Sequence, residues 1–327
     1  MTGELTGPLL DIHLTGADAD AALRADVRAG LTAIPKHLPP KWFYDARGSE
    51  LFEEITELPE YFPTRTERAL LERSADAIAV LSGADTLVEL GSGSSAKTRL
   101  LLDAFLRAGS LRRYVPQDVS EAALRQAMDV LAAEYPGLEL HGVVGDFTAH
   151  LGRLPARGRR IVAFLGGTIG NLLPAERAEF LTGLRAALRP GEQFLLGTGL
   201  VTDPEVLVAA YDDTAGVTAE FNRNVLHVLN RELQADFDVD AFAHKAVWNA
   251  AEEWIEMRLV AGRATTVTVA GLGLVAEFAA GEEMRTEVSA KFRLPGVHDL
   301  LAGAGFEAVR SWTDTDERMA LTLATAV

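Results

Sequence analysis

One stretch, TLVELGSGSSAKT at residues 86–98, constrains the fold of this chain more than any other. It begins as a short apolar run, turns through Gly91 and Gly93, and continues into apolar residues at helical spacing. In doubly wound α/β folds, a buried strand brings a glycine-rich turn to the N-terminus of a helix, where the charged part of a nucleotide-like cofactor binds. The stretch therefore predicts an α/β fold with a cofactor site at this turn.

Strand and helix patterns alternate five times between residues 84 and 200. The strands are expected to end at Leu90, at Asp118, at Asp146, in the apolar run before Asn171, and in GTGLV. Apolar strands joined by helical crossovers are typical of a parallel sheet covered on both faces. This part of the chain is therefore predicted to form a Rossmann-like core.

The order of patterns changes after residue 201. Residues 202–245 have polar, helical patterns, whereas WIEMRLVAG, ATTVTVAGL and GLVAEF are typical of antiparallel strands. The final segment, GFEAVRSWTDTDERMALTLATAV, predicts a hairpin of two strands. We therefore expect an inserted α+β lobe and a C-terminal β-hairpin in addition to the core.

The N-terminal region combines two helices with an aromatic segment. Residues 16–32 and 65–81 each place apolar side chains on one helical face. Between them, residues 36–67 are interrupted by prolines and contain six aromatic side chains. Two interpretations fit this segment equally well: a loop-rich region whose rings cap a core, or a lid over a substrate.

Composition limits the partners and the chemistry. The chain has 327 residues, no cysteine and a formal net charge of −16. The lack of cysteine excludes disulfides, thiolate metal sites and cysteine nucleophiles, and no histidine pair has metal-binding spacing. The negative charge repels nucleic acids and anionic membranes, and we find no signal peptide or membrane-spanning run. We expect a cytoplasmic monomer that binds no metal, nucleic acid or membrane.

Three cofactors are compatible with the glycine turn. GSGSSA at residues 91–96 satisfies the dinucleotide pattern G-x-G-x-x-G/A, and GSGSSAKT nearly matches a P-loop. The P-loop is disfavoured because Ala96 stands where the tight wrap around phosphate needs a second glycine. NAD(P) and S-adenosylmethionine remain, since both carry a ribose whose hydroxyls a carboxylate such as Asp118 can bind. A helix-capping role is the structural alternative for Asp118.

Two observations favour S-adenosylmethionine. The third strand ends at Asp146 and Phe147, which supply an acid for the adenine amino group and an apolar ring beside the base. Lys97 follows the glycines, where its ammonium could pair with the methionine carboxylate, although a solvated lysine is equally consistent with the pattern. Methyl transfer by in-line displacement needs mainly positioning, so the absence of a catalytic triad does not argue against an enzyme.

Five motifs, in order, resemble one family. KWFYDARGSELFEEITELPEYFPTRTE, VELGSGSSAKT, FLGGTIGNL, AYDDTAGVTAEFNRN and GEEMRTEVSAKF are similar to those of the actinobacterial L-histidine Nα-methyltransferases of ergothioneine biosynthesis. The similarity extends from about Leu23 to the end of the chain. It implies a class I methyltransferase fold and S-adenosylmethionine-dependent trimethylation of the α-amino group of L-histidine to hercynine. We expect residues 66–201 and 291–327 to bind the cofactor, and residues 13–65 and 202–290 to bind the amino acid.

The resemblance also implies site residues. Those expected to hold the cofactor are Gly91, Lys97, Asp118, Asp146 and Phe147. Those expected to hold the amino acid are Tyr61, Asn171, Tyr211, Met257, Glu287 and Ser289. Tyr44 is expected close to the amine, where it or a water it holds is a candidate for deprotonation, so the expected catalytic residues are Tyr44 and Asn171.

The chemistry of these side chains fits an amino acid. Glu287 and Ser289 are two apart and so share one face of a strand, from which both can reach an imidazole ring. Asn171 can offer its amide to the amino and carboxylate groups, and Tyr211 can donate to the carboxylate. A solvated strand face and a core tyrosine are the structural alternatives.

Two departures from the family pattern and three other functions remain open. The family often carries Ser where Gly167 stands and Asp where Gly199 stands. The alternatives are an NAD(P)-dependent oxidoreductase that uses the glycine turn, a methyltransferase for another amino acid, and a cofactor-binding protein without turnover.

Overall fold

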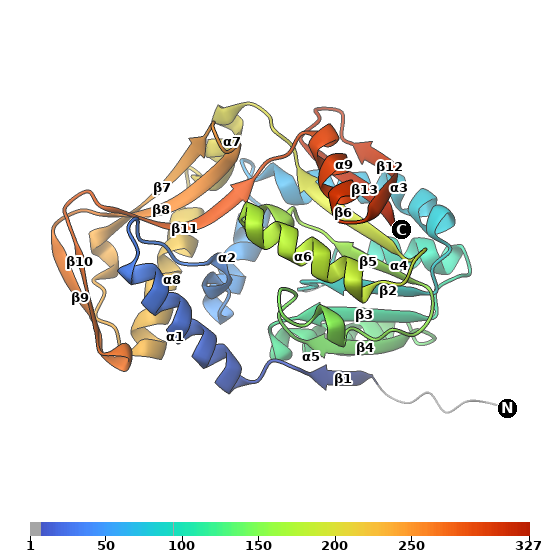
Figure 1. Ribbon diagram of the computed structural model, residues 1–327, viewed down its shortest axis with the longest axis horizontal. Coiled ribbons are helices and arrows are strands. Elements are labelled where there is room, and N and C mark those ends of the chain that lie inside the picture. Colours follow the sequence, from blue (N-terminus) through green and yellow to red (C-terminus); the bar gives the residue numbers. More distant parts are fainter. Residues whose placement is uncertain (1–7, 94) are drawn as a thin grey trace.

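The computed structural model describes residues 8–93 and 95–327, and a large sheet runs through one side of it (Figure 1). In these residues, eight strands form this sheet in the order β1-β4-β3-β2-β5-β6-β13-β12. Their bounds are β1 Leu9–Ile12, β2 Thr86–Leu90, β3 Arg113–Asp118, β4 Glu139–Val144, β5 Arg160–Phe164, β6 Gln193–Gly199, β12 Phe306–Thr313 and β13 Met319–Ala326. The strands from β1 to β6 are parallel and the last two antiparallel. The predicted Rossmann-like core and C-terminal hairpin are confirmed.

Successive strand residues enter different cores on the two faces of the large sheet. Leu87 and Ile161 pack on the face covered by α3 (Phe62–Ser82), α4 (Thr98–Arg107) and α5 (Glu121–Glu134). Val88 and Val162 pack on the opposite face, with α6 (Pro174–Ala187) and α9 (Leu294–Gly303). Because both faces are covered, every residue of the central strands β2, β5 and β6 is buried.

Local signals fix the ends of the helices around the sheet. Ser120 Oγ accepts the backbone N–H of Ala123 at the start of α5, as predicted from the sequence. Gly83 ends α3 in the left-handed conformation, with φ 53°, which glycine adopts readily. The helices predicted at 16–32 and 65–81 are confirmed as α1 (Gly16–Thr32) and as α3, which begins earlier, at Phe62.

A second lobe lies beside the large sheet, at the left of Figure 1. Its antiparallel sheet has the order β11-β8-β7, with bounds β7 Phe242–Asn249, β8 Trp254–Ala261 and β11 Glu283–Ala290. Strands β9 (Thr265–Val269) and β10 (Leu274–Phe278) form a hairpin. These strands share one apolar core with α1, α2 (Ala46–Thr56), α7 (Pro204–Tyr211) and α8 (Val217–Leu233). The predicted α+β lobe is confirmed. None of the described helices has the length and apolar character needed to cross a bilayer.

The structure corrects several boundaries. Residues 242–245, predicted as helix, begin strand β7, because Phe242 and Ala246 enter the lobe core while Ala243 and Lys245 point outward. Residues 36–67 are more regular than predicted, since they contain η1 (Pro40–Phe43), α2 and the start of α3. The third predicted strand ends two residues early, at Val144, and strand β1 and helix α9 were not predicted.

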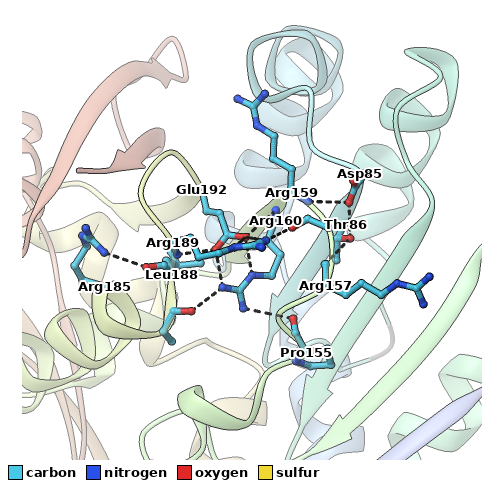
Figure 2. A network of polar contacts seen from close by, with 12 residues as sticks. Asp85, Thr86, Pro155, Arg157, Arg159, Arg160, Arg185, Leu188, Arg189 and Glu192 are labelled. Carbon is cyan, nitrogen blue, oxygen red and sulfur yellow. Dashed lines mark hydrogen bonds and ion pairs between the residues drawn. The ribbon is translucent and has the colours of Figure 1, made fainter.

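A buried ion pair ties the amino ends of β5 and β6 together (Figure 2). Arg160 donates from Nη2 to Glu192 Oε2 (2.6 Å) and from Nε to Oε1 (3.0 Å), and Arg189 Nη2 also donates to Oε1 (2.7 Å). Burial would raise the pKa of Glu192, but the hydrogen bonds from the two arginines outweigh it and lower the pKa to about 2. The pair lies at the opposite end of the parallel strands from the glycine turn, so its role is structural.

Candidate active site

The predicted site residues follow the carboxyl ends of the parallel strands. Strand β2 lies between β3 and β5, and the helices that follow β2 and β5 cover opposite faces of the sheet. Such a reversal opens a crevice at the carboxyl ends of the two strands, where doubly wound folds bind ligands. Gly91 and Asn171 follow β2 and β5 at this edge, and Asp118 is the last residue of β3.

The glycine turn presents its backbone to open space. Gly91 and Gly93 have φ values of 68° and 49°, in the left-handed region. Apart from chain neighbours, no heavy atom of the described residues lies within 4 Å of where a β-carbon would stand at either position. Asp118 closes the turn, because its Oδ2 accepts the Gly93 N–H (2.9 Å) and its Oδ1 accepts the Ser120 N–H (3.0 Å). Each oxygen keeps a lone pair for a ribose hydroxyl.

Asp146 and Phe147 stand in the turn after β4. Asp146 Oδ1 accepts from the Thr148 backbone N–H (2.8 Å) and hydroxyl (2.6 Å), whereas Oδ2 accepts no hydrogen bond from the described residues. The Phe147 ring packs edge-on against Phe164 (4.9 Å between centroids) and Phe180 (5.8 Å). One carboxylate oxygen and an apolar ring are therefore available for an adenine, as the sequence suggested.

Lys97 is anchored by a residue that the sequence analysis missed. Its ammonium pairs with Glu67 of α3, which is fully buried. Glu67 also accepts the backbone N–H of Gly166 through Oε1 (2.7 Å) and Oε2 (2.9 Å). The carboxylate thus links α3 to the helix after the glycine turn and to the loop after β5. Lys97 retains other N–H donors, so its pairing with a methionine carboxylate stays a prediction.

Asn171 has a narrower role than expected. It ends η3 (Thr168–Asn171), and its Nδ2 donates to Glu287 Oε1 (3.0 Å) and to the Val288 carbonyl (2.8 Å). Both amide N–H groups are thereby used, which leaves Oδ1 as the atom that can contact a ligand. Asn171 can accept a hydrogen bond from an amine, but it cannot donate to a carboxylate as the sequence suggested.

Glu287 and Met257 lie side by side in the lobe sheet. They face each other across β11 and β8, so the thioether packs beside the carboxylate. Burial raises the pKa of Glu287 to about 7, against the opposing effects of Lys291 and Asn171. The carboxylate can therefore gain or lose a proton near neutral pH.

Ser289 and Tyr211 form a polar contact that includes an unpredicted lysine. The two hydroxyl oxygens are 2.8 Å apart. Lys291 Nζ donates to Ser289 Oγ (2.7 Å) and to Tyr211 Oη (2.9 Å). His244 fixes the backbone of Tyr211, because its Nε2 lies 2.8 Å from the Tyr211 carbonyl oxygen. Burial lowers the pKa of His244, which keeps the imidazole neutral.

A row of aromatic rings connects the N-terminal segment to this contact. Ring centroids are 5.6 Å apart for Tyr44 and Phe52, 6.3 Å for Phe52 and Tyr61, and 6.1 Å for Tyr61 and Tyr211. Tyr44 is 43% exposed and Tyr61 only 9%. The surrounding protein, together with nearby groups that include Glu287, raises the pKa of both phenols far above the usual value. Both tyrosines therefore stay protonated.

Comparison with known proteins identifies the family of this chain. A family model described as a histidine-specific, SAM-dependent methyltransferase matches residues 23–326. The histidine N-alpha-methyltransferase of Mycolicibacterium smegmatis is 60% identical over 95% of this chain and 97% of its own length, and that of Mycobacterium tuberculosis is 55% identical over the same shares. Ergothioneine biosynthesis protein 1 of Neurospora crassa is 30% identical over 86% of this chain and 32% of its own length. This chain belongs to the histidine-specific, S-adenosylmethionine-dependent methyltransferases.

Proposed function

We propose that this protein transfers three methyl groups in succession to the α-amino group of L-histidine, which yields hercynine for ergothioneine biosynthesis. One observation carries the proposal: Asn171 joins the carboxyl end of β5 to Glu287 of the lobe sheet, next to the Ser289–Tyr211 contact. An acceptor for an amine and groups for a polar ring thus stand at the crevice beside the glycine turn. The names of the relatives and their coverage of the chain support the same reaction.

The large sheet is proposed to hold the cofactor and the smaller lobe the amino acid. Gly91, Lys97, Asp118, Asp146 and Phe147 would hold S-adenosylmethionine, and the open space at the turn and the free Asp146 Oδ2 suit it. When bound, this cofactor supplies an electrophilic methyl group on a sulfonium. We further propose that the protein is a cytoplasmic monomer. The absence of cysteine from the sequence is in keeping with the reducing cytoplasm.

The protein's part in the chemistry is to orient a neutral amine. Each transfer forms an N–C bond and breaks a C–S bond, and the substrate ammonium gives up one proton before its neutral nitrogen attacks. In the first two transfers, Asn171 Oδ1 accepts an amine N–H and so directs the nitrogen lone pair toward the methyl group. Tyr44, held protonated by its raised pKa, does not act as a phenolate base. Its oxygen can accept an amine N–H or hold the water that carries the proton away.

Tyr61, Tyr211 and Met257 complete the proposed amino-acid site. Tyr211 donates its hydroxyl to the substrate carboxylate, Tyr61 packs edge-on against the Tyr211 ring, and Met257 lies beside Glu287. Glu287 and Ser289 contact the imidazole. A ring without N–H groups leaves this carboxylate with Asn171 as its partner but without a partner in the ligand, which costs about 1–3 kcal/mol, or roughly 5- to 150-fold in affinity.

Calorimetric titrations test the proposal against its rivals. We expect S-adenosylmethionine to bind and NAD⁺ not to bind, and L-histidine to bind at least about 10-fold more tightly than L-phenylalanine, which offers no ring N–H. Binding of NAD⁺ alone would support the oxidoreductase instead. Equal binding of the two amino acids would reject the assignment of the ring site.

A further inference from the structure

Lys291 is a buried cation without a carboxylate partner. The residue directly follows β11 and is 8% exposed. Its ammonium lies 4.8 Å from the Tyr211 ring centroid, and no Asp or Glu of the described residues forms an ion pair with it. A β-carbon at Gly199 would stand 3.6 Å from Nζ, so the glycine leaves out a side chain that could reach the ammonium. The ammonium is therefore held by neutral oxygens.

The lysine uses one lone pair on each of two hydroxyl oxygens. Nζ donates to Ser289 Oγ (2.7 Å) and to Tyr211 Oη (2.9 Å), and the two oxygens are themselves 2.8 Å apart. An ammonium can only donate, whereas a hydroxyl has one proton and two lone pairs. The contact between Ser289 and Tyr211 must then use the proton of one of them.

Only two arrangements satisfy this triangle. If Tyr211 donates to Ser289, both serine lone pairs are filled, so Ser289 can only donate to a ligand and Tyr211 can only accept. If Ser289 donates to Tyr211, both tyrosine lone pairs are filled, so Tyr211 can only donate to a ligand and Ser289 can only accept. The contact uses the proton of one hydroxyl, and the lysine fills the last lone pair of the other. Together they make the two hydroxyls face a ligand with opposite senses: one only accepts and the other only donates.

Resting on the proposed function, we infer that Lys291 is a positioning residue that makes Ser289 an acceptor for the substrate ring whenever Tyr211 donates to the substrate carboxylate. Glu287 is the other ring contact, and its Oε1 already accepts from Asn171. Two acceptors then face the two ring nitrogens. The ring binds with N–H on both nitrogens, or shares one proton with Glu287, rather than as a neutral ring beside a carboxylate.

This arrangement links binding to a proton. The free imidazole has a pKa of about 6.5, and burial raises that of Glu287 to about 7, so above both values neither group holds a proton. In the complex, the bound imidazole and Glu287 together hold one proton. The other ionisable groups near Glu287 are the Lys291 ammonium and the phenols of Tyr44, Tyr61 and Tyr211. The pKa values of the Tyr44 and Tyr61 phenols are raised, so neither of these two groups supplies the proton.

Titration with hercynine isolates this proton, because its trimethylated nitrogen carries none. Heats measured in two buffers of different ionisation enthalpy give the number of protons exchanged. We expect uptake of about one proton per hercynine at about pH 8, and release of about one proton below about pH 6, with a change of sign near pH 7. Binding at pH 8 without proton uptake would overturn the inference but leave the proposed function standing. Absence of any hercynine or histidine binding would overturn both.

Lys291→Met tests the role of the lysine itself. Without the ammonium that holds both oxygens, the contact between Ser289 and Tyr211 can open and both hydroxyls can donate to a ligand, so a neutral ring can bind and the uptake at pH 8 should fall to less than about half a proton. Lys245→Met is the matched control, since Lys245 pairs with Glu283 at the lobe surface (2.7 Å). It should leave the proton number unchanged. If a folded Lys291→Met variant takes up the same number of protons per hercynine as the wild type, the inference is contradicted. If the variant does not fold, the proton uptake of the wild-type protein still tests the inference.

Discussion

Which atoms of a single residue can donate or accept a hydrogen bond decides what the site can bind. Asn171 donates its two side-chain N–H groups to Glu287 and to the Val288 carbonyl, so only its Oδ1 can contact an amine, as an acceptor. Glu287, next to it, presents a carboxylate whose pKa lies at about 7. These two residues separate the roles of the site: one end orients the nucleophile and the other recognises the ring.

Glu287→Ala should therefore weaken histidine and spare the cofactor. Loss of a hydrogen bond to a charged group costs about 1.5–3 kcal/mol, so we expect roughly 10- to 100-fold weaker histidine binding by calorimetry. S-adenosylmethionine affinity should not change. Glu283→Ala, on the same strand but paired with Lys245 and Arg258, is the control and should bind histidine normally. Unchanged histidine affinity in Glu287→Ala would remove this residue from the ring site.

Tyr44→Phe should slow turnover more than it weakens binding. The phenol oxygen is the proposed acceptor for the amine or its water, so its loss should lower kcat by roughly 10- to 100-fold with little change in KM for histidine. Tyr135→Phe, whose hydroxyl contacts Asp103 on the surface (2.9 Å), is the matched control. A higher KM for histidine with a normal kcat would instead make Tyr44 a binding residue.

At this scale the residue pattern indicated the cofactor contacts, whereas the amino-acid contacts came only from a family resemblance. The residues that support both sets were missed. Glu67 could have been found, because it continues the buried face of α3 through Leu70, Leu71 and Ser74. Lys291 could not: a lysine after a strand usually lies in solvent, and its burial depends on the packing of β11 against Tyr211, far away in the sequence. The departure at Gly199 became meaningful only beside this lysine.

At the scale of elements, one carboxylate connects the two sides of the crevice. Glu67 holds the N-terminal end of α4 through Lys97 and the loop after β5 through the Gly166 N–H. The first element carries the glycine turn, and the second continues to Asn171. The relative placement of the cofactor and amine sites thus depends on α3.

Glu67→Ala should destabilise the protein markedly. The change leaves a buried N–H and an ammonium without their partner, which costs about 3 kcal/mol or more in the free energy of unfolding. Glu72→Ala, on the same helix, removes only an exposed pair with Arg68 (3.2 Å) and should change the free energy by less than about 1 kcal/mol. Urea unfolding followed by circular dichroism compares them. Equal losses in both variants would contradict this account of Glu67.

The element pattern was largely predictable where neighbours in sequence also pack together. The five parallel strands and their helices follow apolar periodicity, which local sequence carries. Strand β1 was missed because its pairing partner, β4, lies far along the chain, and a short apolar run gives no sign of it. The start of β7 was missed because its exposed positions made residues 202–245 look uniformly polar and helical.

At the scale of the whole molecule, two buried carboxyl groups make stability depend on pH in opposite directions. Burial raises the pKa of Glu89 to about 7, despite hydrogen bonds from Thr98 (2.5 Å) and Tyr114. A raised pKa favours the protonated form, so this contribution to stability is lost as the pH rises from about 4.5 through 7. The pKa of Glu192, lowered to about 2, gives stability above about pH 4.5 that is lost as the pH falls toward 2.

Glu89→Gln should flatten the upper part of this profile. The amide keeps the shape but carries no charge, so the variant should lose less stability than the wild type between about pH 5 and pH 8. Thermal unfolding midpoints across this range give the comparison. Glu121→Gln, in the first turn of α5 with an exposed pair to Arg125, is the control. Parallel profiles for the wild type and Glu89→Gln would show that Glu89 is not the group responsible.

The proposed reaction requires the cofactor held by one lobe and the amino acid held by the other to meet at a single nitrogen. Mass spectrometry of L-histidine incubated with the protein and S-adenosylmethionine tests this most directly, with fragmentation to locate the added groups. We predict species carrying one, two and finally three methyl groups, all on the α-nitrogen, ending as hercynine. Methyl groups on the imidazole ring, or no methylated histidine at all, would contradict the account.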